Sequence, residues 1–209
     1  MNSGRECRAY FELLSNTILS LSYEDLERVS HVLVRAYERQ RTVFLFGNGG
    51  SAALASHFAC DLSKGTINGS KTRYRALALT DNIPVMTAWA NDSSYEDIFA
   101  EQLATFGSPG DVAFAISASG NSPNVIKALK HAKQSGMTTA GITGFSGGRM
   151  GGLCDACIIV PCDNMQIIED LHVCIAHSLF TCVREMIGRN APAISVSSGP
   201  QLVVRTATR

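Results

Sequence analysis

The segments VFLFGNGGS (Val43–Ser51) and VAFAISASGNS (Val112–Ser122) decide the fold of this 209-residue chain. Each is an apolar run of strand length that breaks into a turn of Gly, Ser and Asn and then enters a helical pattern. Glycine-rich turns expose backbone N–H groups, the following helix adds the positive end of its dipole, and serine hydroxyls add neutral donors. Either loop alone is as consistent with an ordinary turn, but the pair indicates a phosphorylated ligand.

Five short apolar segments separated by helical patterns predict the sheet. The predicted strands are Thr42–Phe46, Tyr74–Leu79, Val112–Ser117, Thr138–Thr143 and Ala156–Val160. They are about five residues long and lack clean alternation, which is typical of strands covered on both faces. Strand, crossover helix and strand in succession predict a doubly wound, parallel, five-stranded α/β sandwich. Ligands of such sheets bind beyond the carboxyl ends of the strands, where both Gly/Ser loops fall.

Two helices are predicted before the first strand and one long helix after the last. The first spans about Glu6–Leu19, and the second begins at Ser22, which has capping-box spacing to Asp25. The length favours a single domain over residues 1–188, in which the helices of residues 1–40 pack on the domain or in an oligomer. The final helix is expected to end near Ile187, and residues 189–209 are expected to form a loose tail.

Charge and cysteine content limit the class of protein. Eighteen basic and eighteen acidic residues cancel, so the chain lacks the positive charge that sequence-independent nucleic-acid binding needs. Neither a signal peptide nor an apolar stretch of membrane-spanning length is recognisable, and we expect a cytoplasmic protein with neither nucleic-acid nor membrane partners. The seven cysteines lie in apolar segments, which predicts reduced, buried thiols without a disulfide framework.

Two further motifs have both a functional and a structural interpretation. Cys154 and Cys157, with Cys162 close behind, have a spacing that occurs in redox and metal sites. Because Cys157 opens the apolar run CIIV and Cys162 follows a proline, a strand would separate these thiols, and we favour the structural interpretation. The stretch Gly141–Gly152 is likewise expected to form a tight turn into a short helix rather than to contact a ligand.

The loop at Gly47 matches neither of two familiar phosphate-binding signatures. A dinucleotide-binding loop needs glycine at its sixth position and an acidic residue about twenty positions on, but Ala52 stands at the sixth position. The Walker A pattern also fails, because no Gly-Lys-Ser/Thr occurs. The loop is instead rich in Ser and Asn, which suits a phosphate monoester held by neutral donors beside hydroxyl-rich groups.

The order of motifs along the chain resembles that of the sugar isomerase (SIS) domain family and, within it, of the phosphoheptose isomerases. The motifs are GNGGS, a following helix with His57, AND at Ala90–Asp92, ISASGNSPNV and IEDLHVCIAH. The likeness extends over about Tyr10–Ile187. It implies a SIS-type, flavodoxin-like sheet and isomerisation of sedoheptulose 7-phosphate to a D-glycero-D-manno-heptose 7-phosphate through an enediol. It also implies a homotetramer with sites at subunit interfaces.

The resemblance also implies roles for individual residues. Phosphate would be held by the second loop, and the sugar by the first loop and the AND segment. The implied substrate-binding residues are Asn48, Gly49, Gly50, Ser51, Asn91, Asp92, Ser117, Ala118, Ser119, Ser122 and Glu169. The implied catalytic residues are Asp61, His177 and Glu169, and a divalent metal, commonly zinc in the family, would be held by His57, Asp61, Glu169 and His177.

The spacing of the four implied metal ligands is coherent without the resemblance. His57 and Asp61 share a helix face, and Glu169 and His177 lie on similar faces two turns apart. Two imidazoles and two carboxylates suit Zn, Fe or Mn. Each residue alone would more often be a core or interface histidine or a solvated helix end, so it is the order of all four that favours a shared site.

Asp61 and Glu169 depart from the family pattern, which has glutamate and glutamine at these positions. Withdrawing a carboxylate by one methylene moves it by about 1 Å, which can cost on the order of a hundredfold in rate. The added charge of Glu169 favours a cation in the same site. Either the two residues redistribute their roles, or they mark a subgroup that uses another sugar phosphate. His172 and Asp170 are expected to be structural or interfacial.

Three classes of function remain. A sugar-phosphate isomerase accounts for both loops and for the four candidate ligands. A non-catalytic phosphosugar-binding or assembly protein of the same fold would generally lack the two histidines, which are present. A transcriptional regulator would need an added helix-turn-helix domain, for which the sequence has no segment.

Overall fold

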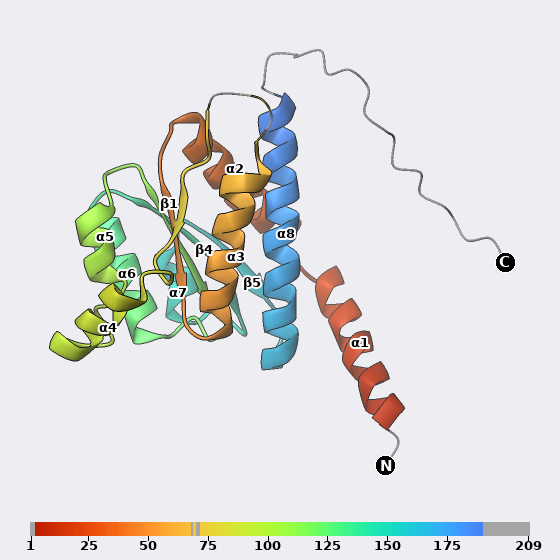
Figure 1. Ribbon diagram of the computed structural model, residues 1–209. Coiled ribbons are helices and arrows are strands. Elements are labelled where there is room, and N and C mark those ends of the chain that lie inside the picture. The colour runs from red at the N-terminus through yellow and green to blue at the C-terminus, as the bar shows by residue number, and fades with distance from the viewer. Residues whose placement is uncertain (1–2, 68, 70–71, 190–209) are drawn as a thin grey trace.

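Five parallel strands form one sheet in the computed structural model (Figure 1), which describes residues 3–67, 69 and 72–189. The strand order is β2-β1-β3-β4-β5, and every neighbouring pair is parallel. The bounds are β1 Val43–Gly47, β2 Ala76–Ala78, β3 Val112–Ser117, β4 Thr138–Gly144 and β5 Ala156–Val160. The predicted doubly wound α/β sheet is therefore confirmed. Its edge strand β2 is shorter than predicted, because it pairs with β1 alone over three residues.

Helices alternate with the strands after an N-terminal pair, as predicted. Their bounds are α1 Ser3–Leu19, α2 Tyr23–Glu38, α3 Gly50–Gly65, α4 Ile83–Asp92, α5 Ala100–Phe106, α6 Pro123–Gln134, α7 Gly148–Leu153 and α8 Met165–Arg189. The Ser22 hydroxyl accepts the N–H of Asp25 at 3.2 Å and caps α2. None of the described helices combines the length and the apolar character needed to cross a membrane. The tail predicted at residues 189–209 lies, beyond the end of α8, outside the described residues.

Helices cover both faces of the sheet (Figure 1). All five residues of β1 are buried, and alternate side chains enter opposite cores. Val43 and Leu45 join the core formed with α2, α3 and α8, whereas Phe44 and Phe46 join the core formed with α5, α6 and α7. The helices α3 and α8, which carry the candidate metal ligands, therefore lie on the same face of the sheet.

The helices α3 and α8 run side by side because small and large residues meet between them (Figure 1). A Cβ atom at Gly65 would lie 2.5 Å from Cζ of Phe180. No larger residue fits at Gly65 unless the ring moves, so this glycine permits the close approach of the helices. Residues more than a hundred positions apart in sequence are thereby brought within side-chain reach.

The first helix extends away from the sheet (Figure 1) and keeps large apolar side chains in solvent. Phe11 and Leu19 are 64% and 74% exposed. Tyr10 is tied to α8 through a hydrogen bond from its hydroxyl to Asp170. The N-terminal helices were predicted to pack on the domain or in an oligomer, and the exposed surface of α1 remains a candidate for subunit contact.

Four of the seven cysteines are exposed, which corrects the prediction that they are buried. Cys7, Cys60, Cys174 and Cys182 lie on α1, α3 and α8, where apolar neighbours in sequence face the core and these positions face outward. All seven belong to the described residues and are free thiols, as predicted. Cys154 and Cys157 are within hydrogen-bond reach, so the expectation that the strand separates these two thiols is wrong. Their hydrogen bond and burial raise the pKa of Cys154, which opposes the thiolate that redox chemistry or metal binding needs.

Candidate functional site

The two Gly/Ser loops lie side by side at the carboxyl edge of the sheet. Strands β1 and β3 are neighbours, with Gly47 aligned with Ile116, and the strand order reverses between them. A Cβ atom at Gly47 would lie 2.5 Å from the carbonyl oxygen of Ile116, so this close approach requires glycine. The predicted ligand position at the switch in strand order is thus formed by both loops together.

The first loop joins β1 directly to α3. Gly49 has a φ of 54°, a left-handed conformation that glycine adopts at no steric cost. The turn closes where the N–H of Ser51 donates to the carbonyl of Asn48 at 3.0 Å. Because α3, a helix of 16 residues, begins at this loop, the positive end of its dipole points to the loop. This end of a helix attracts the oxygen atoms of an anion such as phosphate.

The second loop gathers three serine hydroxyls between β3 and α6. The Ser117 and Ser122 hydroxyl oxygens lie 3.4 Å apart, and Ser119 accepts the N–H of Asn121 at 3.2 Å. Ser117 and Ala118 are 5% and 8% exposed. Neutral hydroxyl and backbone groups at the start of a helix form a surface that suits a phosphate monoester.

Helix α7 packs against the second loop and forms hydrogen bonds with its backbone and side chains. The N–H of Met150 donates to the carbonyl of Gly120 at 2.9 Å, and the N–H of Arg149 donates to Oδ1 of Asn121 at 3.0 Å. A Cβ atom at Gly148 would lie 2.5 Å from the Ser119 carbonyl oxygen. The predicted turn and short helix within residues 141–152 are confirmed, and they fix the shape of the loop.

An amide pair links the two loops. Nδ2 of Asn48 donates to Oδ1 of Asn124 at 2.9 Å, and Nδ2 of Asn124 donates to Oδ1 of Asn48 at 2.8 Å. The Tyr95 hydroxyl donates to Oδ1 of Asn48 at 3.0 Å from the segment between α4 and α5. Three segments of the chain therefore meet at the side chain of Asn48.

The AND segment lies at the end of α4 with both candidate side chains exposed. Nδ2 of Asn91 donates to Oδ1 of Asp92 at 2.8 Å. The segment that follows is anchored to α6, because the buried Asp97 forms an ion pair with Lys127. The hydrogen bond from Lys127, with a further one from Ser93, lowers the pKa of Asp97. This ion pair ties the AND segment to the helix that follows the second loop.

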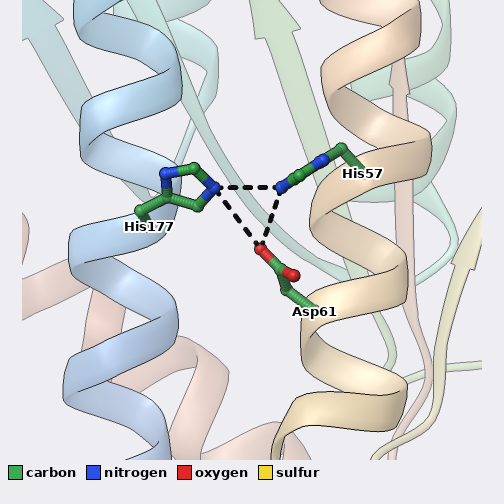
Figure 2. Close-up of side chains that lie close together, drawn as sticks. All are labelled: His57, Asp61 and His177. Carbon is green, nitrogen blue, oxygen red and sulfur yellow. Dashed lines mark hydrogen bonds and ion pairs between the residues drawn. The ribbon is translucent and has the colours of Figure 1, made fainter.

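Three of the four candidate metal ligands converge between α3 and α8 (Figure 2). Nε2 of His57 lies 2.9 Å from Nε2 of His177. Oδ2 of Asp61 lies 3.3 Å from the former nitrogen and 3.8 Å from the latter. Oδ2 is buried and has no hydrogen-bond partner among the described residues. An uncompensated carboxylate oxygen between two imidazole nitrogens fits a divalent cation.

Glu169 lies apart from this cluster, nearer the first loop. A Cβ atom at Gly50 would lie 3.8 Å from the carboxyl carbon and both carboxylate oxygens of Glu169. Glu169 borders a cavity of about 220 Å³ that is also lined by Ser51 and Leu54. The structure therefore unites His57, Asp61 and His177 and places the fourth predicted ligand where a loop-bound molecule would reach it.

His172 and Asp170 were predicted to be structural or interfacial, and both have structural surroundings. Asp170 accepts the hydroxyl hydrogen of Tyr10. His172 is 1% exposed, and its ring nitrogens make no hydrogen bond of good geometry among the described residues, although the backbone of Thr143 is near enough to interact. Burial lowers its pKa to about 4, with a smaller opposing effect from the Thr143 carbonyl. The two histidines of α8 thus differ, since His177 is half exposed and His172 is a neutral part of the core.

Asn124 and Tyr95 contribute to the site but were not predicted. Asn124 stands in the quoted motif ISASGNSPNV, yet its partner lies 76 residues earlier in the chain. Tyr95 follows the AND segment, and its ring is exposed. No local spacing indicates either contact, because both depend on how β1, β3 and the segment before α5 are placed by the sheet.

Comparisons with known proteins agree with this geometry. Residues 8–144 match the SIS domain family. The chain is 38% identical to the phosphoheptose isomerase of Helicobacter pylori strain P12 over 179 residues, which cover 86% of this chain and 92% of that protein. It is 42% identical to the phosphoheptose isomerase of Paramagnetospirillum magneticum over 163 residues, which cover 75% and 81%.

The solved structure of a phosphoheptose isomerase from Neisseria gonorrhoeae superposes with a TM-score of 0.81 at 28% identity. The superposition covers 87% of this chain and 98% of that one. Sequence and structure therefore identify the same relatives, and they do so over nearly the whole described chain. The chain belongs to the SIS domain family, among the phosphoheptose isomerases, and it is an isomerase.

Proposed function

We propose that the chain interconverts sedoheptulose 7-phosphate and a D-glycero-D-manno-heptose 7-phosphate through an enediol. The observation that carries the proposal is the convergence of His57, Asp61 and His177 between α3, which begins at the first loop, and α8, which packs on the same face of the sheet. The relatives named phosphoheptose isomerase support this choice of sugar. The second loop, with Ser117, Ala118, Ser119 and Ser122, holds the phosphate. The first loop and the AND segment hold the sugar.

We assign different tasks to the two unusual carboxylates. The buried Oδ2 of Asp61 lies between two imidazoles, which suits a metal ligand and leaves no open path to a substrate carbon. The carboxylate of Glu169 faces a cavity beside Gly50, which suits a base that meets the sugar. This assignment redistributes the roles that the family gives to the two positions. It gives one physical reason for both departures of this chain from the family pattern, Asp61 and Glu169.

The proton transfers proceed from these positions. The Glu169 carboxylate removes a proton from C1 of the ketose, and the released electron pair forms the C1–C2 double bond of the enediol. Glu169 returns the proton to C2, while His177 moves a proton from the C1 oxygen to the C2 oxygen. The product aldose has the same atoms as the ketose. Asn91 and Asp92 orient the hydroxyl groups of the sugar chain.

A divalent metal, zinc in our proposal, would be held by His57, Asp61 and His177, whereas Glu169, the fourth predicted ligand, lies outside this cluster. Two nitrogen donors and a carboxylate suit this ion. When bound, it supplies positive charge that polarises the carbonyl of the sugar. The fit rests on the unpartnered Oδ2 of Asp61, which needs a cation or a donor.

The site is proposed to be completed by other copies of the chain. The side chains of His57 and His177 are 53% and 51% exposed, and α1 presents Phe11 and Leu19 to solvent. Covering these groups would exclude water from the reacting sugar. We therefore expect a homotetramer with sites at subunit interfaces, acting in the cytoplasm, and light scattering after gel filtration measures its mass.

The test is incubation of metal-analysed protein with sedoheptulose 7-phosphate while the heptose 7-phosphate signals are followed by NMR. Conversion that depends on a divalent metal is expected. No conversion with any of several divalent metals, together with retained binding of the sugar phosphate, would overturn catalysis in favour of a non-catalytic phosphosugar-binding protein.

Two isosteric variants test the division of roles. Glu169→Gln is expected to abolish turnover and to retain the metal, whereas Asp61→Asn is expected to lose the metal as well. Glu185→Gln, an exposed carboxylate farther along α8, is the matched control and should resemble the unaltered protein. If Glu169→Gln loses the metal and Asp61→Asn retains it, the assignment of the two carboxylates is reversed.

A further inference from the structure

Asn124 is a buried amide that no proposed catalytic or substrate-binding role includes. It is 2% exposed and lies in the first turn of α6, just after the second loop. Both of its hydrogen bonds to another side chain go to Asn48 in the first loop. Asn124 therefore spends its hydrogen bonds to other side chains on Asn48, a proposed substrate-binding residue. Such a residue is a candidate for controlling the orientation in which Asn48 meets the substrate.

One backbone group fixes the direction of the amide pair. The N–H of Val125 donates to Oδ1 of Asn124 at 2.9 Å. Because a backbone N–H can only donate, the atom it meets must be the amide oxygen of Asn124. The Asn124 nitrogen is then the atom that faces Oδ1 of Asn48 at 2.8 Å. The orientation of Asn48 in the first loop therefore follows from a backbone N–H of α6.

The remaining hydrogen-bonding capacity of Asn48 is of one kind. Its oxygen accepts from both Asn124 and the Tyr95 hydroxyl, which occupies its two lone pairs. Its nitrogen spends one N–H on Asn124 and keeps the other. Among the described residues, the side chain of Asn48 therefore has only one N–H left, with which it can donate a hydrogen bond to a ligand. Oxygen atoms of a sugar, whether carbonyl, hydroxyl or the developing oxyanion of an enediol, accept such a bond.

We propose that Asn124 is a positioning residue that holds the Asn48 amide with its free N–H toward an oxygen of the sugar and keeps the two loops at a fixed spacing. The identity of the sugar rests on the proposed function, but the orientation of Asn48 does not. Tyr95 assists by occupying the second lone pair of the Asn48 oxygen. The phosphate, which is held by the second loop, does not depend on this pair.

A double-mutant cycle on Asn48 and Asn124 tests the proposal. Kd values for sedoheptulose 7-phosphate and for inorganic phosphate are measured by calorimetry on the full chain with Asn48→Ala, Asn124→Ala and both. Asn124→Ala is expected to weaken sugar-phosphate binding about tenfold in the parent, and about twofold or less when Asn48 is already alanine. Inorganic phosphate affinity should change by less than about threefold. Additive losses, or an equal loss for inorganic phosphate, would overturn the proposal.

Asn121→Ala is the matched control, since this amide lies in the same loop and bonds to Ser119 and Arg149 instead of Asn48. Its effect should add to that of Asn48→Ala. The ligand-free protein gives an independent answer through the side-chain amide NMR signals of Asn48, which Asn124→Ala should shift and Asn121→Ala should not. Failure of the parent to bind the heptose phosphate would refute the proposed function, whereas unshifted Asn48 signals in Asn124→Ala would refute the positioning role.

Discussion

The loop edge of the sheet and the α3–α8 helix pair are opposite kinds of surface. At the loop edge, neutral amides and hydroxyls satisfy one another, as the Asn48–Asn124 pair does. Between the helices, two imidazoles face a buried carboxylate oxygen without a hydrogen-bond partner among the described residues. A surface with satisfied hydrogen bonds binds without rearranging, whereas an unsatisfied charged cluster needs a cation. The proposed function uses this difference, because it assigns recognition of the sugar phosphate to the loops and the chemistry to the helices.

The largest expected effect is that of His177→Ala, which should separate the two surfaces. Removing a proton-transfer group lowers kcat on the order of a thousandfold, while the loop edge should bind inorganic phosphate as before. Turnover is followed by NMR and phosphate affinity by calorimetry. A comparable loss of phosphate affinity would contradict the division between the surfaces.

Removal of metal by a chelator should come next in size. We expect turnover to fall by less than it does in His177→Ala, because the proton-transfer groups remain, and to return with one equivalent of divalent ion per chain. Because an ion binds only the folded arrangement of α3 and α8, saturating metal should also stabilise the fold by about 3–4 kcal/mol. His57→Ala should show neither effect, as metal analysis and thermal unfolding can test. A metal-dependent stabilisation that persists in His57→Ala would place the ion elsewhere.

A smaller effect is expected at the loop edge. Ser119→Ala removes one neutral donor from the second loop and should raise KM about tenfold with little change in kcat. Ser146→Ala, which truncates an exposed hydroxyl in the turn before α7, serves as the control. Steady-state kinetics separates the two parameters. A fall in kcat instead of a rise in KM would mean that the loop takes part in chemistry.

The smallest expected effect is on the free energy of unfolding in acid, and it distinguishes the two histidines of α8. Burial lowers the pKa of His172 to about 4 in the fold, below its value of about 6.5 in an unfolded chain. The unfolded state thus binds the proton more readily, and the stability that the neutral ring contributes above pH 6.5 is lost as the pH falls toward 4. His172→Leu should reduce this acid loss by about 1–3 kcal/mol, as urea unfolding at pH 7.5 and pH 4.5 measures.

His177→Leu provides the contrast, because it removes a half-exposed ring and leaves the buried ring of His172, to which we assign the acid loss, in place. His172→Leu should also be well tolerated at neutral pH, because the ring nitrogens make no hydrogen bond of good geometry among the described residues and leucine adds no buried polar atom. If His172→Leu loses as much stability in acid as the unaltered protein does, burial of this ring does not cause the acid loss.

The sequence predicts what depends on neighbours along the chain. The strands at Val112–Ser117 and Ala156–Val160 have the predicted bounds, because apolar runs and the turns after them are local signals. His57 and Asp61 share a helix face by spacing alone. Parallel topology then brings both loops to one edge, so their proximity also follows from the pattern.

What depends on the packing of distant segments does not follow from local spacing. A shared site of His57 and His177 was expected from the order of motifs, but their meeting across 120 residues depends on Gly65, which lets α3 approach α8. The Asn48–Asn124 pair depends in the same way on the alignment of β1 with β3. Exposed cysteines such as Cys174 were mistaken for core residues, since a long helix beside a sheet mixes apolar residues on its inner and outer faces.

The half-exposed histidines of the helix pair have a consequence for how a metal would be chosen. In the single chain the side chains of His57, Asp61 and His177 are 53%, 25% and 51% exposed, so an ion can reach them before subunits assemble. Nitrogen and oxygen donors bind nickel and copper at least as tightly as iron or manganese, and selectivity then follows the supply of each ion. An immobilised nickel column would therefore offer the proposed site an ion that can replace bound iron or manganese. The metal content measured in a purified sample would then depend on the purification method as well as on the cells that produced the protein.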